Sequence, residues 1–208
     1  MSNRATDTSQ RDRDRTSGAI LSAATELFLE RGYAAIPISL IAKQANVTKS
    51  LIYHYFGDKR GLWLAVKDAS VAAYAVQQRA VFSSNETELT EGGVATSVAA
   101  YFSFLQEQPE IARMFALEGF EVEFSPGDTE RELQASGIAF IKLLQSRGVM
   151  REDIDPGMVL AAFSALTEHW FISQERVAEL NKKRTGPSLD ANYLDAIQKI
   201  LSGGLQPS

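Results

Sequence analysis

The chain has 208 residues, of which 45% are hydrophobic and 23% are charged, and this composition is ordinary for a globular protein. It contains no cysteine, which excludes disulfides, thiolate metal sites and cysteine nucleophiles. The net charge of −5 is unevenly spread: residues 1–63 carry nine Lys/Arg and six Asp/Glu, whereas residues 64–208 carry twelve and twenty. A basic N-terminal part suits contact with a polyanion, although so modest an excess also arises by chance.

The N-terminus is polar. Residues 1–14 have almost no apolar side chains, so we expect a disordered arm whose arginines give at most weak attraction to phosphates. The segment lacks the apolar core of a signal peptide, and no apolar run approaches the ~18–20 residues that span a bilayer. We therefore expect a cytoplasmic protein with no membrane partner.

Residues 15–61 predict three short helices. The first has one apolar stripe and is followed by Gly32, which takes the left-handed conformation of a helix end without strain. Pro37 suits the first position of the second helix, where its missing N–H costs nothing. Asn46 tolerates the left-handed geometry of a sharp turn, and the Thr48 hydroxyl can cap the third helix. This arrangement predicts a helix-turn-helix.

The rest of the chain also has helical periodicity. Asp58 is a plausible cap for a helix from Lys59 to about Phe82. We predict further helices at Gly93–Gln106, Pro109–Gly119, Asp128–Arg147, Pro156–Leu180 and Leu189–Leu201. Sustained two-residue alternation is absent, so we expect an all-α fold: an N-terminal three-helix helix-turn-helix domain at residues 15–61 and a larger helical domain at residues 62–208.

The third helix has the two faces of a DNA-recognition helix. We expect Val47, Ile52 and Phe56 to point inward, which leaves polar and basic side chains outward: Lys49, Ser50, Tyr53 and His54. Lysine can donate to guanine or to a phosphate, and serine and tyrosine hydroxyls reach either partner at shorter range. Tyr55 fits the core and the surface equally well.

The segment resembles the helix-turn-helix of the TetR family of transcriptional regulators over about the first third of the chain. The similarity rests on fixed positions: Gly32-Tyr33, Ile41-Ala42, Ala45, Val47-Thr48-Lys49, Ile52 to Phe56, Lys59 and Leu62. The resemblance implies a homodimeric repressor that a small molecule releases from double-stranded DNA. It also implies DNA contacts at the positions of Lys49, Ser50, Tyr53, His54 and Lys59.

Three positions depart from the family pattern: Asn46 stands where a glycine is frequent in the turn, which its backbone tolerates, and two others bear on DNA contacts. Ile36-Pro37 stand where members often carry a Thr/Ser pair that reaches a phosphate, and proline has no N–H to donate. Leu51 stands where a small or polar residue is common, and it either packs on thymine methyl groups or turns inward as filler. With Thr48 at the start of the helix, the candidate DNA-binding residues are Thr48, Lys49, Ser50, Leu51, Tyr53, His54 and Lys59.

The helix at 156–180 is apolar on more than one face. One face carries Val159, Ala162, Phe163, Leu166 and Trp170, and another carries Leu160, Ser164, Thr167 and Phe171. Such a helix is buried on both sides, either within one subunit or against a symmetry mate. Because one helix-turn-helix makes few contacts, we expect a homodimer on a pseudo-palindromic operator, formed through this helix and the helix at 189–201.

An effector pocket is a weaker inference from aromatic residues interspersed with polar ones. The candidate ligand-binding residues are Tyr101, Arg113, Phe115, Glu118, His169 and Trp170. Glutamates beside aromatics suit a cation, whereas Arg113 with His169 suits a carboxylate, and both alternatives stay open. Core packing explains the aromatics equally well.

Other classes of function have less support. The two histidines, His54 and His169, lie far apart in the sequence, and no GxSxG, Walker or dinucleotide motif is present. We therefore expect no catalytic residues, no metal site and no cofactor. An interaction or architectural module without sequence-specific DNA binding is the alternative that the Ile36-Pro37 departure favours.

Overall fold

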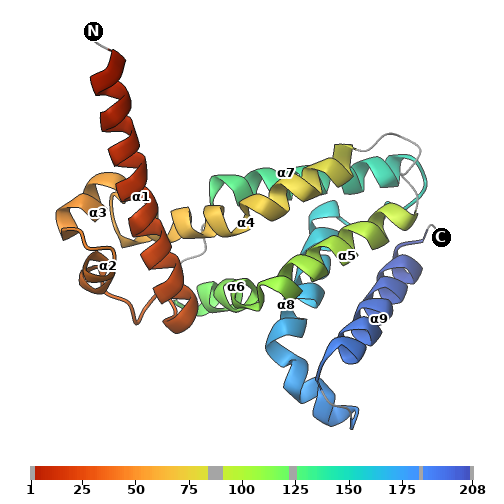
Figure 1. Cartoon of the computed structure of the whole chain (residues 1–208). Helices are drawn as coiled ribbons and strands as arrows, with labels where there is room; N and C mark the ends of the chain where they lie inside the picture. The colour runs from red at the N-terminus through yellow and green to blue at the C-terminus, as the bar shows by residue number, and fades with distance from the viewer. Residues whose placement is uncertain (1–2, 84–90, 122–125, 183–184, 207–208) are drawn as a thin grey trace. The chain divides into compact units, whose positions relative to one another are not determined.

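The computed structural model describes residues 3–83, 91–121, 126–182 and 185–206. These residues form nine helices and no strand, which confirms the all-α prediction (Figure 1). The helices are α1 (Asn3–Arg31), α2 (Ile38–Gln44), α3 (Lys49–Phe56), α4 (Lys59–Ser83), α5 (Glu91–Glu107), α6 (Pro109–Glu121), α7 (Asp128–Ser146), α8 (Pro156–Leu180) and α9 (Pro187–Leu205). No described helix combines the length and apolar character that a bilayer crossing requires.

The chain divides into two compact units. The first comprises Met1–Ser70 and Leu117–Gly127, and the second comprises Val71–Ala116 and Asp128–Ser208. The predicted boundary at residue 61 is therefore too early, because the first turns of α4 belong to the core of the first unit. Trp63 is buried there and makes an edge contact with Phe28, with 5.3 Å between the ring centroids.

The prediction of a disordered arm at residues 1–14 is wrong for residues 3–14, which are the first turns of α1; residues 1–2 lie outside the described part of the chain. Residues 3–14 contain no proline, and they include arginine and glutamine, which favour helices. Extending an existing helix adds one hydrogen bond for each residue that is fixed, so the well-packed second half of α1 can propagate into a segment that has no core of its own.

A buried ion pair joins two segments of the first unit. The Lys67 Nζ on α4 donates to both carboxylate oxygens of Glu118 on α6, at 2.7 and 2.6 Å. Their side chains are 1% and 4% exposed. Nearby, a Cβ on Gly127 would collide with the Asp68 carboxylate, which would have to move to admit any larger residue. The end of α6 is thus held against α4.

The second unit has two apolar clusters. The larger joins α5, α8 and α9 through Val98, Phe102, Trp170, Leu189, Ile197 and Leu201. The smaller joins α7, the loop after it and the start of α8 through Phe140, Ile141, Leu144, Met150 and Val159. Gly137 permits close packing of α7 on α8, since an added Cβ would lie 3.2 Å from a Leu160 methyl carbon.

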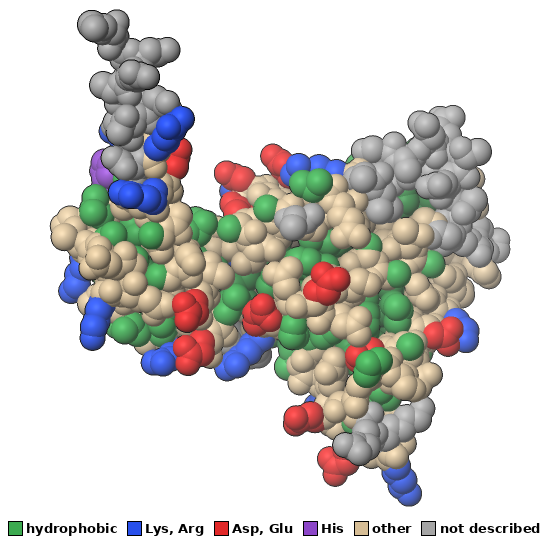
Figure 2. Space-filling model, in the orientation of Figure 1, with side chains coloured by type: hydrophobic (Ala, Val, Ile, Leu, Met, Phe, Trp, Pro, Cys, Tyr) green, Lys and Arg blue, Asp and Glu red, His purple; other side chains and the backbone are tan. Residues whose placement is uncertain are grey.

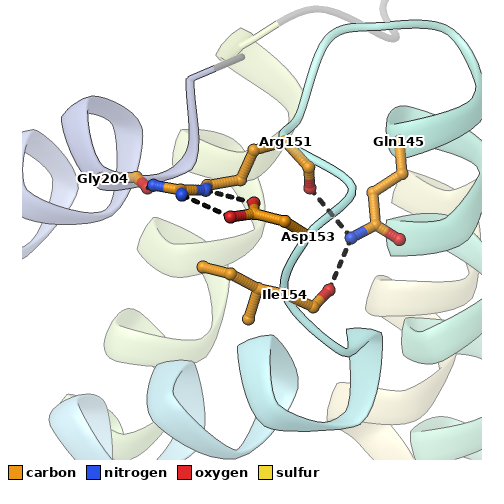
Figure 3. A network of polar contacts seen from close by, with 5 residues as sticks. All are labelled: Gln145, Arg151, Asp153, Ile154 and Gly204. Atoms are coloured by element: carbon orange, nitrogen blue, oxygen red, sulfur yellow. Dashed lines mark hydrogen bonds and ion pairs between the residues drawn. The ribbon is translucent and has the colours of Figure 1, made fainter. Parts of the chain in front are cut away.

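Polar contacts fasten the loop between α7 and α8 to the end of α9 (Figure 3). The Arg151 backbone N–H donates to the Leu205 carbonyl at 2.8 Å, and its side chain reaches the Gly204 carbonyl at 3.4 Å. Asp153 orients that guanidinium through two hydrogen bonds of 2.6 Å. Gln145 donates to the carbonyls of Arg151 and Ile154. Carbonyls that α9 leaves without helical partners are satisfied in this way.

Candidate nucleic-acid interface and ligand site

The chain makes a tight turn between α2 and α3. Asn46 has a φ of 54°, the left-handed conformation expected for it, and the Val47 N–H donates to the Ala42 carbonyl at 2.9 Å. Thr48 has an extended conformation and its hydroxyl oxygen accepts from the Leu51 N–H at 3.4 Å, so its predicted capping role is confirmed. The sequence thereby places α3 across α2 as the second helix of a helix-turn-helix.

One face of α3 is open to solvent. Six of the seven candidate DNA-binding residues are exposed: Thr48, Lys49, Ser50, Leu51, Tyr53 and His54. Ile52 is fully buried, whereas Val47 and Phe56 are only half-buried, so the inward face is narrower than predicted. Tyr55 is half-buried as well. Figure 2 shows lysine and arginine side chains along the outer edge of the first unit, over α1 to α3.

Two large side chains with apolar surface are exposed on this face. Tyr53 is 49% exposed and Leu51 is 37% exposed. Leu51 therefore lies at the surface and does not turn inward. A leucine beside a tyrosine, a lysine and a serine gives the face both apolar contacts for thymine methyl groups and hydrogen-bond donors for base edges and phosphates.

Lys59, the seventh candidate, is half-buried at the start of α4. Its Nζ lies 4.2 Å from the centre of the Tyr33 ring and 3.5 Å from the Ala34 carbonyl oxygen. Asp58 caps the helix by accepting from the Gly61 N–H at 2.7 Å, as predicted. Burial and, secondarily, the Asp58 charge raise the pKa of Tyr33 above its usual value. Lys59 is thus a positioned cation beside an aromatic ring.

Pro37 occupies a different position from the one predicted. It is the residue before α2, with extended backbone angles and no side-chain hydrogen bond to the helix, and not the first helical residue. The next residue but one, Ser39, is exposed. It was absent from the predicted set, although a hydroxyl in the first turn of α2 is chemically able to contact a phosphate.

The six predicted ligand-binding residues lie in different surroundings. Glu118 lies in the first unit, ion-paired with Lys67, while the other five lie in the second unit. Trp170 is a core residue whose indole N–H donates to Asp190 at 2.9 Å and whose ring stacks on Tyr193 at 4.1 Å. Arg113 and His169 are exposed, and His169 lies 3.1 Å from an Arg176 nitrogen. Phe115 is half-buried.

Tyr101 instead belongs to an aromatic cluster within the second unit. We define this cluster as Tyr74 on α4, Tyr101 and Phe104 on α5, and Phe163 on α8. The Tyr74 ring lies 4.9 Å from Tyr101 and 5.0 Å from Phe104, and Tyr101 lies 5.6 Å from Phe163. The Tyr101 hydroxyl donates to the Glu168 carboxylate at 2.6 Å. Burial and the Glu168 charge raise the pKa of both tyrosines well above the usual value.

The apolar exposed face of α8 differs from both faces predicted for dimerisation. Residues of the predicted faces are mostly buried or half-buried within this chain, Ala162 being exposed. The open face includes Met158, Ala161, Ala162, Ala165 and Ile172, and Ile200 is exposed on the neighbouring α9. Ile172 is 51% and Ile200 64% exposed. We call these six residues the α8–α9 face. Three alanines lie between the larger Met158 and Ile172 on α8, and such small residues allow another helix to approach closely.

Comparisons with known proteins agree with this geometry. Residues 20–66 match the model of bacterial regulatory proteins of the tetR family. NicS of Pseudomonas putida, an HTH-type transcriptional repressor, is 26% identical over 163 residues, which cover 74% of each chain. FasR of Mycolicibacterium smegmatis, an HTH-type transcriptional activator, is 31% identical over 102 residues, or 49% of this chain and 46% of FasR.

A solved structure shares the fold over nearly the whole chain. The transcriptional regulator FadR from Bacillus subtilis, in complex with stearoyl-CoA, has a TM-score of 0.67 and 18% identity, and the match covers 90% of this chain and 98% of FadR. Residues 20–66 thus carry a helix-turn-helix of the tetR family, and the chain is similar over about three quarters of its length to a helix-turn-helix transcriptional repressor. These relatives give no support to the alternative of an architectural module.

Proposed function

We propose that the protein is a homodimeric repressor that binds a pseudo-palindromic operator and leaves it when a small molecule binds the second unit. The observation that carries the proposal is the exposed face of α3, where Lys49, Ser50 and Tyr53 stand out from a helix that Ile52 anchors. A helix of this kind enters the major groove with its first residues against base edges.

The expected DNA contacts are of two kinds, contacts to base edges and contacts to the phosphate backbone. Lys49, in the first turn of α3, reaches guanine acceptors or a phosphate, and Ser50 is small enough to let the backbone approach the groove. Tyr53 lies one turn further on and offers a hydroxyl together with an apolar ring. Lys59, steadied by Tyr33, suits the flanking phosphate backbone.

Dimerisation follows from the α8–α9 face. Isoleucines exposed on each of two adjacent helices are apolar surface that a two-fold related copy would cover, giving a bundle of two helices from each subunit. Pairing would set two α3 helices about 34–36 Å apart, the spacing of one turn of DNA. A single α3 presents too few side chains for specific binding at physiological salt.

Effector response is proposed through α4. This helix starts at Lys59, beside the DNA-binding face, and carries Tyr74 into the aromatic cluster of the second unit. A ligand that favours one position of Tyr74 therefore acts on a helix whose first turns belong to the first unit. The FadR structure holds stearoyl-CoA, which supports effector binding in this fold. Repression is favoured over activation because NicS, a repressor, aligns over more of the chain than FasR.

Substituting Lys49 or Tyr53 by alanine is expected to weaken operator binding by ~1–3 kcal/mol each, because each loses its contacts to base edges or phosphates. Fluorescence anisotropy with a selected operator measures the affinity, and circular dichroism checks the fold. Lys142→Ala, an exposed lysine of the second unit, is the matched control for lost positive charge. Unchanged affinity in both α3 variants would remove α3 as the recognition helix.

A further inference from the structure

The aromatic cluster and Glu168 form a site whose chemistry narrows the effector class. Three of its rings, those of Tyr74, Tyr101 and Phe104, are at most 7% exposed, while Phe163 and Glu168 are half-buried. Solvent therefore reaches the site at Phe163 and the carboxylate. Glu168 is fixed there by the 2.6 Å hydrogen bond from the Tyr101 hydroxyl. A carboxylate held against stacked aromatic rings is a preorganised anionic group in an apolar setting.

Two carboxylates act on the same hydroxyl. Burial is the largest cause that raises the pKa of Tyr101. The charge of Glu168 on α8 raises this pKa further, and the charge of Glu130 on α7 adds a smaller effect. The negative charge in direct contact with the cluster is that of Glu168, which accepts from the Tyr101 hydroxyl. Negative potential in a poorly hydrated region attracts a cation more strongly than the same charges would in water.

Unsatisfied polar atoms lie on the same helices. Gln78 is one turn after Tyr74 on α4 and is 2% exposed, and Ser97 is one turn before Tyr101 on α5 and is 8% exposed. Among the described residues the Gln78 Oε1 and the Ser97 Oγ have no hydrogen-bond partner. A buried acceptor of this kind needs a donor.

We propose that the effector is an organic cation, an amine or quaternary ammonium with an apolar body, held by Glu168 and the faces of the aromatic cluster. This inference rests on the proposed function, since it specifies the chemistry of the same effector site. Glu168 neutralises the positive charge, and the electron-rich faces of Phe163 and the tyrosines attract it further. An amine would also supply donors to acceptors such as the Gln78 Oε1. The Glu168 carboxylate disfavours anionic effectors, acyl-CoA among them.

Calorimetric titration of the full-length protein with benzyltrimethylammonium tests the charge requirement, because neopentylbenzene has the same shape without the charge. The cation is expected to bind and the neutral analogue to bind at least about tenfold more weakly. Glu168→Gln keeps an acceptor for Tyr101 and is expected to weaken cation binding by about tenfold or more. Glu175→Gln, which removes an exposed carboxylate of α8, is the matched control and is expected to leave the affinity for the cation unchanged.

Failure of this inference is separable from failure of the proposed function. Operator binding by the wild-type protein is measured first without any probe. If the operator is bound but the cation is not, or if Glu168→Gln and Glu175→Gln behave alike, the cationic effector is refuted and the regulator stands. Tighter binding of stearoyl-CoA than of the cation would also refute the proposal of a cationic effector. Absence of any specific operator would instead refute the proposed function.

Discussion

Replacing Lys67 by methionine is expected to lower the free energy of unfolding by about 3–5 kcal/mol. Methionine fills a similar volume but leaves the Glu118 carboxylate without the ammonium that now bonds both of its oxygens, at 2.6 and 2.7 Å. That carboxylate is nearly excluded from solvent, so water does not replace the lost partner. Urea denaturation followed by circular dichroism measures the loss.

The double variant Lys67→Met/Glu118→Met separates an unpaired charge from simple loss of packing. Removing both charges is expected to recover most of the stability, because neither a buried charge nor its desolvation remains. Lys199→Met provides the exposed control, since the pairing of Lys199 with Asp195 is open to solvent and contributes little. A double variant as unstable as the single one would contradict the ion-pair interpretation.

The double substitution Ile172→Asp/Ile200→Asp is expected to convert the dimer to a monomer and to weaken operator binding on the order of a thousandfold, toward non-specific affinity. Both isoleucines are more than half exposed in one chain, so charging them costs the monomer little while it places carboxylates in the proposed interface. Sedimentation equilibrium measures the mass, and anisotropy with the operator measures the affinity.

Leu143→Asp serves as the control for an added charge at an exposed apolar position, because Leu143 lies on α7 and outside the α8–α9 face. It is expected to leave both the mass and the affinity unchanged. If the Ile172/Ile200 variant stays dimeric, the α8–α9 face is not the interface. If it becomes monomeric yet keeps full affinity, pairing is not what makes DNA binding specific.

Local signals in the sequence predict the recognition segment closely. Asn46 takes the left-handed turn and Thr48 and Asp58 act as caps, because each of these roles depends on residues within a few positions of one another. The bounds of α8 are also as predicted, since Asp155 and Pro156 form a local start signal. The seven candidate DNA-binding residues remain a prediction in their roles, with six of them now placed on the exposed surface.

Long-range contacts could not be predicted in the same way. Periodicity shows that a helix such as α8 has several apolar faces, but which face stays open depends on the helices that cover the others. Glu118 was assigned to a ligand pocket because its partner Lys67 is 51 positions away in the sequence. No local pattern indicates that the two residues form an ion pair. Likewise Tyr74 on α4 and the α8 residues Phe163 and Glu168 join Tyr101 on α5 only through tertiary packing.

Selection of bound duplexes from a random DNA pool tests the central claim most directly. The protein is expected to enrich an inverted repeat whose half-sites are centred about one helical turn apart, and binding to it should survive competitor DNA. Lys49→Ala and Tyr53→Ala should each reduce that enrichment. Recovery of no common sequence, with binding that falls steeply as salt is added for every duplex alike, would contradict the account.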